Sequence, residues 1–258
     1  MEEKKTLRYS HTYLLTAGEC NCEGVMPVTL VAARAIEVAT EHANMLGIGY
    51  ATLSKRGIGW VLSRISVEMK RWPGINEHYT VSTWIEGWTR LYSDRVFEIA
   101  DADGNIIGHV RTVWVAIDMV KRSVADLTGI ASDDLVWRDG VCPLPKQRRI
   151  PTVPVDRATT VSDYTFRYCD LDFNRHVNSV RYIEHILNLW TPGHYANFAL
   201  QRFEIAYVHE CLFGETVTMA ALETAGDVPE AVVDMTRRGE RVIAAHLTFS
   251  PRDCYSNR

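Results

Sequence analysis

The chain has 258 residues, of which 47% are hydrophobic and 23% are charged, and its formal net charge is −4. This composition is typical of a globular protein and excludes wholesale disorder. At roughly 100–200 residues per domain, the length fits one large domain or two small ones, with a core that needs no disulfide or metal. The mild acidity excludes nucleic-acid binding through bulk positive charge.

No export or membrane segment is expected. The sequence starts with charged residues and no apolar segment follows them. No stretch approaches the ~18 consecutive apolar residues of a membrane-spanning helix. The six cysteines lack the spacing of a disulfide framework, which is typical of free thiols in a reducing cytosol: Cys20, Cys22, Cys142, Cys169, Cys211 and Cys254. We therefore expect a cytoplasmic protein.

An apolar periodicity predicts a helix over 29–46, with Thr29 as its cap and Gly47 at its end. Alternating apolar and polar residues then predict four strands, at 60–69, 79–85, 94–100 and 106–117. Asp103-Gly104-Asn105 is the expected turn between the last two.

The same order of elements follows in the second half. A helix is predicted over 178–190, with Asn178 as its cap. Strands are predicted after it, at 202–207, 215–222, 231–237 and 241–249. A helix followed by a long antiparallel sheet, occurring twice, indicates a tandem duplication of an α+β unit in which the sheet wraps the helix.

A proline-rich and basic stretch separates the two halves. It contains four prolines and the run Lys146-Gln147-Arg148-Arg149. Prolines neither donate to a sheet nor continue a helix, so this composition predicts a linker. The expected division is therefore an N-terminal domain at 1–135, a linker at 136–155 and a C-terminal domain at 156–258.

The densest polar cluster lies at 168–178 and reads Tyr-Cys-Asp-Leu-Asp-Phe-Asn-Arg-His-Val-Asn. From Asp170 it starts like a calcium loop, but Arg175 and Arg181 stand where that loop needs glycine and glutamate. No second pair of ligands at zinc spacing accompanies His176, and no Gly-x-Ser-x-Gly motif occurs. Neither a metal nor a cofactor is expected.

Asp172, Asn174 and His176 remain as candidates for acid–base or carboxylate chemistry. They directly precede the second helix, whose N-terminal N–H groups and dipole stabilise a developing oxyanion. The alternative is a polar turn in which these side chains only cap the backbone. Spacing alone does not decide between the two.

The segment Asp172-Phe-Asn174-Arg-His176-Val-Asn178-Ser-Val-Arg-Tyr182 resembles the signature of acyl-[acyl-carrier-protein] thioesterases, with Ser179 in place of the usual second asparagine. Further resemblances are Glu210-Cys211, Trp60-Val-Leu-Ser-Arg64, Trp72-Pro73 and Thr80-Val-Ser-Thr-Trp84. The resemblance covers nearly the whole chain. It implies an α+β fold of two tandem hotdog domains. It also implies an enzyme that hydrolyses fatty acyl thioesters of acyl carrier protein.

By this resemblance, Asp172, Asn174, His176 and Glu210 form the catalytic set of the second hotdog. Either Asp172 attacks the thioester to form a mixed anhydride, or Asp172 or Glu210 acts as general base on water. Cys211 is expected to pack in the core, because neighbouring residues of a strand face opposite sides and an adjacent Glu raises a thiolate pKa.

The first half offers a comparison. Aligning Ile36-Glu37 with Ile183-Glu184 places Val25, Pro27 and Thr29 opposite the polar set, so only the second hotdog is expected to be catalytic. The first is expected to shape the acyl tunnel. Trp60, Leu62 and Arg64 are its candidate substrate-binding residues, with ordinary strand packing as the alternative.

An acidic acyl carrier protein requires a local basic surface on this acidic chain. Candidates are Lys121-Arg122, the run 146–149, and Arg175 with Arg181. The alternative functions are an acyl-coenzyme A thioesterase, a hotdog dehydratase of 3-hydroxyacyl thioesters, and a non-catalytic acyl-binding module. The sequence leaves open whether the chain is a monomer or a homodimer.

Overall fold

The computed structural model describes residues 6–130, 132–224, 226 and 228–252. The charged residues 1–5 and Cys254 lie outside these ranges. The chain divides into two compact units, Met1–Lys146 (unit 1) and Gln147–Arg258 (unit 2). In the described ranges, no helix is both long enough and apolar enough to cross a membrane.

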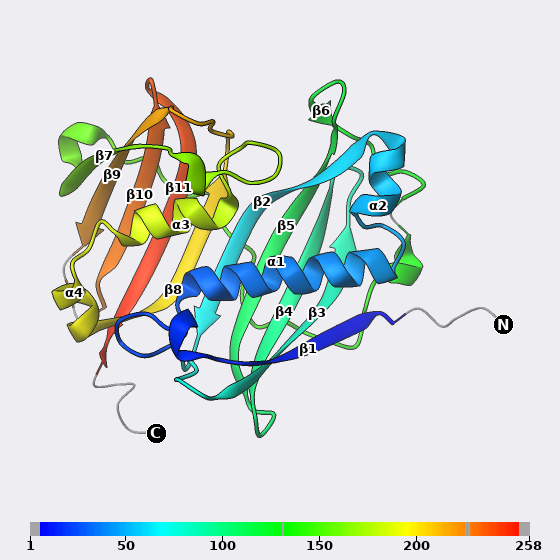
Figure 1. Cartoon of the computed structure of the whole chain (residues 1–258), viewed down its shortest axis with the longest axis horizontal. Helices are drawn as coiled ribbons and strands as arrows, with labels where there is room; N and C mark the ends of the chain where they lie inside the picture. Colours follow the sequence, from blue (N-terminus) through cyan, green and yellow to red (C-terminus); the bar gives the residue numbers. More distant parts are fainter. Residues whose placement is uncertain (1–5, 131, 225, 227, 253–258) are drawn as a thin grey trace. The chain divides into compact units, whose positions relative to one another are not determined.

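Unit 1 is an antiparallel sheet with one long helix, α1, lying across a face of it (Figure 1). Its strands have the order β1-β3-β4-β5-β2, and the short β6 pairs with β5. The elements are β1 (Arg8–Leu14), η1 (Ala17–Glu19), α1 (Val28–Met45), α2 (Tyr50–Leu53), η2 (Ser54–Arg56), β2 (Ile58–Met69), β3 (His78–Trp88), β4 (Tyr92–Asp101), β5 (Ile106–Asp118), β6 (Ser123–Val124) and η3 (Asp133–Leu135).

Unit 2 repeats this arrangement with α3 across its sheet (Figure 1). Its strand order, β7-β9-β10-β11-β8, matches that of unit 1 element by element. The elements are η4 (Val155–Arg157), β7 (Thr160–Thr165), η5 (Tyr168–Asp170), α3 (Ser179–Leu187), α4 (Pro192–Asn197), β8 (Phe198–Tyr207), β9 (Thr216–Thr224), β10 (Glu230–Arg237) and β11 (Glu240–Pro251). The predicted α+β fold, in which each half wraps a sheet around a helix, is confirmed.

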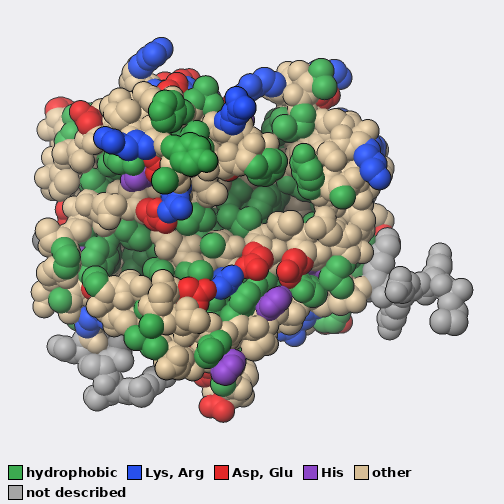
Figure 2. Space-filling model, in the orientation of Figure 1, with side chains coloured by type: hydrophobic (Ala, Val, Ile, Leu, Met, Phe, Trp, Pro, Cys, Tyr) green, Lys and Arg blue, Asp and Glu red, His purple; other side chains and the backbone are tan. Residues whose placement is uncertain are grey.

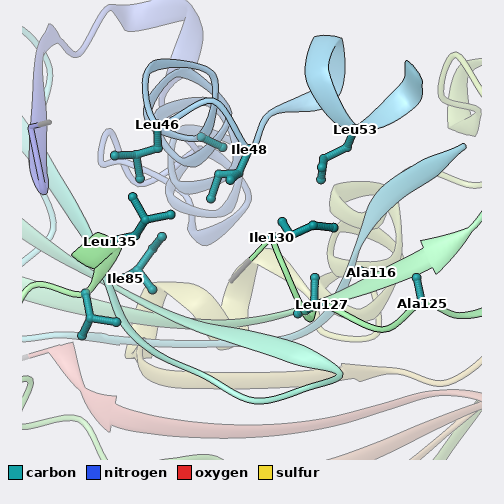
Figure 3. Packing of buried hydrophobic residues seen from close by; sticks show 11 residues of the cluster. Leu46, Ile48, Leu53, Ile85, Ala116, Ala125, Leu127, Ile130 and Leu135 are labelled. Carbon is teal, nitrogen blue, oxygen red and sulfur yellow. The ribbon is translucent and has the colours of Figure 1, made fainter. Parts of the chain in front are cut away.

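The apolar residues of α1 explain its place against the sheet. Val31, Ala35 and Val38 recur at helical spacing and are buried. Beyond the end of α1, Leu46, Ile48 and Leu53 point toward Ile85, Leu127 and Ile130, forming one hydrophobic cluster (Figure 3). The burial of these side chains holds helix and sheet together.

The helix ends differ from the sequence prediction in two places. The N-cap of α1 is Pro27, so the predicted cap, Thr29, lies within the first turn. Gly47 follows the helix with a φ of 75°, which glycine adopts without strain. The N-cap of α3 is Asn178, as predicted, and its Oδ1 accepts from the Val180 N–H at 2.9 Å. However, α3 ends at Leu187 rather than at 190.

The linker is held along its length by buried side chains and by charged residues of the two sheets. In unit 1, Arg111 pairs with Glu86 and donates to the carbonyl of Leu144. In unit 2, Arg241 pairs with Asp234 and donates to the Ile150 carbonyl at 3.1 Å. Each unit therefore fixes its own part of the linker.

Candidate functional site

The predicted signature forms the loop between η5 and α3 in unit 2. Asp172 closes this loop: its Oδ1 accepts from the backbone N–H of Asn174 at 2.8 Å and of His176 at 3.1 Å. The Asp172 N–H also donates to the carbonyl of His176 at 2.8 Å. One carboxylate oxygen therefore holds the turn, and the other makes no hydrogen bond or ion pair with the described residues.

The loop is paired with the segment between β8 and β9. His176 forms a bridge with Leu212, and the Val177 N–H donates to the Cys211 carbonyl at 2.8 Å. This pairing brings His176 beside Glu210. The His176 Nδ1 lies 3.1 Å from the Glu210 Oε2, with the two side chains 30% and 45% exposed.

The contact with Glu210 bears on the tautomer of the His176 ring. A carboxylate beside Nδ1 favours the tautomer that carries its proton on that nitrogen. The neutral ring then carries its lone pair on Nε2, the form that a general base requires. A half-exposed pair of this kind is open to a substrate in solution.

Asn174 is exposed, and its backbone N–H donates to Asp172. Its side-chain amide makes no hydrogen bond with the other residues of the predicted set, so the structure joins Asp172, His176 and Glu210 by direct contacts but not the Asn174 amide. At the start of α3, Asn178 accepts from the N–H groups of Val180 and Arg181. Most of the N–H groups that we expected to stabilise an oxyanion are thus capped.

Cys211 is fully buried, with 0% exposure, and burial raises the pKa of its thiol. A buried, protonated thiol is a poor nucleophile. Glu210 and Cys211 follow β8 and do not lie within a strand, so the expected alternation of strand residues does not separate their side chains. Their side chains nevertheless diverge, since Glu210 is exposed.

Beneath the loop lies a buried acid–base pair that the sequence reasoning missed. The Asp170 Oδ1 lies 3.0 Å from the His185 Nε2 of α3, and Oδ2 accepts from the Tyr164 hydroxyl at 3.0 Å. Burial raises the pKa of Asp170, but hydrogen bonds from the Arg167 N–H, His185 and Tyr164 outweigh it and lower the pKa below its ordinary value. The Asp170 carbonyl also accepts from the Asn178 N–H at 2.8 Å, which ties the loop to the helix.

Unit 1 contains the same turn without the candidate residues of unit 2. The Asn21 side-chain oxygen accepts from the N–H groups of Glu23 at 3.2 Å and Val25 at 3.1 Å. The Asn21 N–H donates to the Val25 carbonyl at 2.9 Å. The Asn21 side chain thus holds the turn of unit 1 as the Asp172 side chain holds the turn of unit 2.

These bonds correct the alignment drawn from the sequence. The residue of unit 1 that corresponds to His176 is Val25 and not Thr29. Aligning the shared Ile-Glu pairs therefore shifts one helix against the other by about one turn. The Met26 N–H donates to the Pro73 carbonyl at 2.9 Å, as Val177 does to Cys211. Trp72, which precedes Pro73, therefore stands in the place of Glu210. The His–Glu pair is thus absent from this loop of unit 1.

The buried pair also has a counterpart in unit 1. The Arg34 Nη2 lies 2.6 Å from the Glu19 Oε1, and the Arg34 guanidinium lies 4.2 Å from the Tyr13 ring centre. In unit 2 the ring centres of His185 and Tyr164 are 3.8 Å apart. Both units therefore place a basic side chain, Arg34 or His185, between a carboxylate and a tyrosine.

The three substrate-binding candidates of unit 1 differ in burial and packing. Trp60 packs against the hydrophobic cluster and donates to the Ile48 carbonyl at 2.9 Å. Leu62 is buried, whereas Arg64 is exposed. A shift in the register of β2 between Leu62 and Arg64 breaks the alternation that would have placed all three on one face.

Replacing His185 with leucine is expected to destabilise the protein by about 1–3 kcal/mol and to lower kcat with little change in KM, because Asp170 loses a buried partner. The double variant D170E/H185R copies the Glu19–Arg34 pair of unit 1 and is expected to restore both the stability and kcat. Urea unfolding and steady-state kinetics check this. If H185L had wild-type kcat, the pair would have no role in holding the loop.

A family model described as the acyl-ACP thioesterase N-terminal domain matches residues 6–132, and one described as the C-terminal domain matches residues 154–251. An oleoyl-acyl carrier protein thioesterase of Arabidopsis thaliana is 24% identical, over 85% of this chain and 64% of its own length. The chain thus spans less than two thirds of that relative.

Two solved structures extend the comparison. An acyl-ACP thioesterase from Bacteroides thetaiotaomicron has a TM-score of 0.86 and 31% identity, covering 96% of this chain and 100% of its own. The 12:0-ACP thioesterase from Umbellularia californica has the same TM-score at 19% identity, covering 95% and 94%. The chain belongs to the acyl-ACP thioesterase family.

Proposed function

We propose that this chain hydrolyses the thioester of fatty acyl–acyl carrier protein and releases a free fatty acid. The observation that carries the proposal is the His176–Glu210 pair, held beside Asp172 by two paired loops in a chain of this family. Unit 1, which has Val25 and Trp72 in the corresponding places, is proposed to shape the acyl pocket.

Two routes use these groups. In the first, the free Asp172 carboxylate oxygen attacks the carbonyl carbon, the carbon–sulfur bond breaks and the carrier thiolate leaves. His176 then takes a proton from water as the water attacks the mixed anhydride, which releases the fatty acid and restores the Asp172 carboxylate. His176 finally gives up this proton, which neutralises the carrier thiolate. In the second route, His176 takes the proton of water as the water attacks the thioester, and passes it to the thiolate.

In both routes Glu210 supports the positive charge that develops on the His176 ring. The Asn174 side chain, exposed beside the pair, is the group proposed to orient water or donate to the oxyanion.

The test is release of thiol and free acid from acyl-carrier protein and from acyl-coenzyme A of several chain lengths. The proposal expects a higher kcat/KM for carrier-protein substrates. A preference for the coenzyme A thioesters would identify an acyl-coenzyme A thioesterase. Loss of water from 3-hydroxyacyl thioesters, without release of thiol, would identify a dehydratase.

A further inference from the structure

Large aromatic side chains are exposed on η5 and on the two loops that carry His176 and Glu210. Tyr168 is 82% exposed, Phe173 79% and Phe213 64%. Exposing aromatic rings to water is unfavourable, and a group of them on loops around a site is typical of an interaction surface. Figure 2 shows hydrophobic and basic side chains close together on the face of unit 2 above α3.

The corresponding positions of unit 1 are small or aliphatic. By the equivalent hydrogen bonds described above, Tyr168 and Phe173 correspond to Ala17 and Cys22, and Phe213 corresponds to Ile75. The shared fold therefore does not require aromatic rings here. The exposed aromatic rings are therefore a feature of unit 2 that unit 1 lacks.

Arg175 marks the same surface. It adopts a φ of 65°, in the left-handed region that favours glycine, and its counterpart in unit 1 is Gly24 with a φ of 73°. The Arg175 side chain is exposed and makes no hydrogen bond or ion pair with the described residues. A glycine would fit the backbone better, so the turn itself does not require an arginine here.

We propose that Tyr168, Phe173, Arg175 and Phe213 form the docking surface for the acidic carrier protein; this rests on the proposed function. The net charge of −4 repels an acidic partner, so the attraction must be local. Arg175 supplies an unpaired positive charge directly beside His176. Of the other basic candidates, Lys146 is paired with Asp94, and Arg181 with Glu184. Arg148 and Arg149 are also exposed, but they belong to the linker and not to the loops that carry His176 and Glu210. A carrier seated here delivers its thioester to the His176–Glu210 pair.

The test compares R175G and F173S with R122G, since Arg122 is an exposed arginine with a φ of 52° in unit 1. R175G and F173S are expected to raise KM for acyl-carrier protein about tenfold, with kcat and the KM for acyl-coenzyme A unchanged. Added salt is expected to raise the wild-type KM and to affect R175G less. R122G is expected to match wild type. Thermal unfolding should show R175G at least as stable as wild type.

Two outcomes would overturn the proposal: an unchanged KM for acyl-carrier protein in both variants, or an equal rise with both carriers, which would assign Arg175 to the phosphate of the pantetheine arm. Direct binding of acyl-carrier protein to H176A, with and without R175G, separates this proposal from the proposed function. Absence of hydrolysis by the wild type defeats the function, whereas equal affinity of the two H176A proteins defeats the docking surface.

Discussion

Replacing His176 with alanine is expected to lower kcat about 10²–10⁴-fold with little change in KM, because the ring supplies proton transfer in the transition state and not ground-state binding. The ring is 3.1 Å from Glu210 and partly exposed, so its loss leaves no buried cavity. Thiol release from acyl-carrier protein at saturating substrate measures the effect.

The duplication supplies a matched control for this variant. Val25 has the same place in the turn of unit 1, so V25A removes a side chain from an equivalent backbone position. V25A is expected to keep wild-type kcat. Full activity of H176A, or an equal loss in V25A, would contradict the assignment of the chemistry to unit 2.

Replacing Asp172 with asparagine is expected to lower kcat by at least about 10²-fold while leaving the fold intact. Asn21 shows that an amide oxygen holds this turn as well as a carboxylate does. D172N therefore removes the charge and keeps the hydrogen bonds to the loop. D172A, which removes both, is expected to lose stability as well.

The measurements are kcat and the free energy of unfolding, with N21D as the control in unit 1. Wild-type kcat in D172N would reduce Asp172 to a residue that only shapes the loop. Label found in the Asp172 carboxylate after a single turnover in water labelled with heavy oxygen would identify the mixed-anhydride route, because direct attack of water on the thioester never places label there.

Hydrophobic periodicity predicted the elements that carry the core. α1 repeats its apolar residues at helical spacing and the central strands alternate apolar and polar residues, and the structure places them within a few residues of the prediction. The edge strands β1 and β7 were not predicted. Their sequences, RYSHTYL and TVSDYT, are mostly polar, because an edge strand faces water and contributes little to the core.

Part of the candidate site was predicted from short motifs, and part was found only in the structure. The signature identified Asp172, Asn174 and His176, and the resemblance added Glu210, because all four lie in short motifs. Asp170 and His185 escaped notice, since 15 residues separate them and only the packing of α3 against the loop brings them together. The alignment of the two halves went wrong by one helical turn, because a shared Ile-Glu pair fits a helix equally well in either position.

By itself, therefore, the sequence determined that this protein is a duplicated α+β fold with one polar loop before its second helix. Those features are local: periodicity, caps and motif spacing are written in neighbouring residues. Tertiary structure alone decided that His176 meets Glu210 and that Arg175 corresponds to a glycine of unit 1. The first depends on the pairing of two loops distant in the chain, and the second on equivalent hydrogen bonds in the two units. No local pattern encodes either.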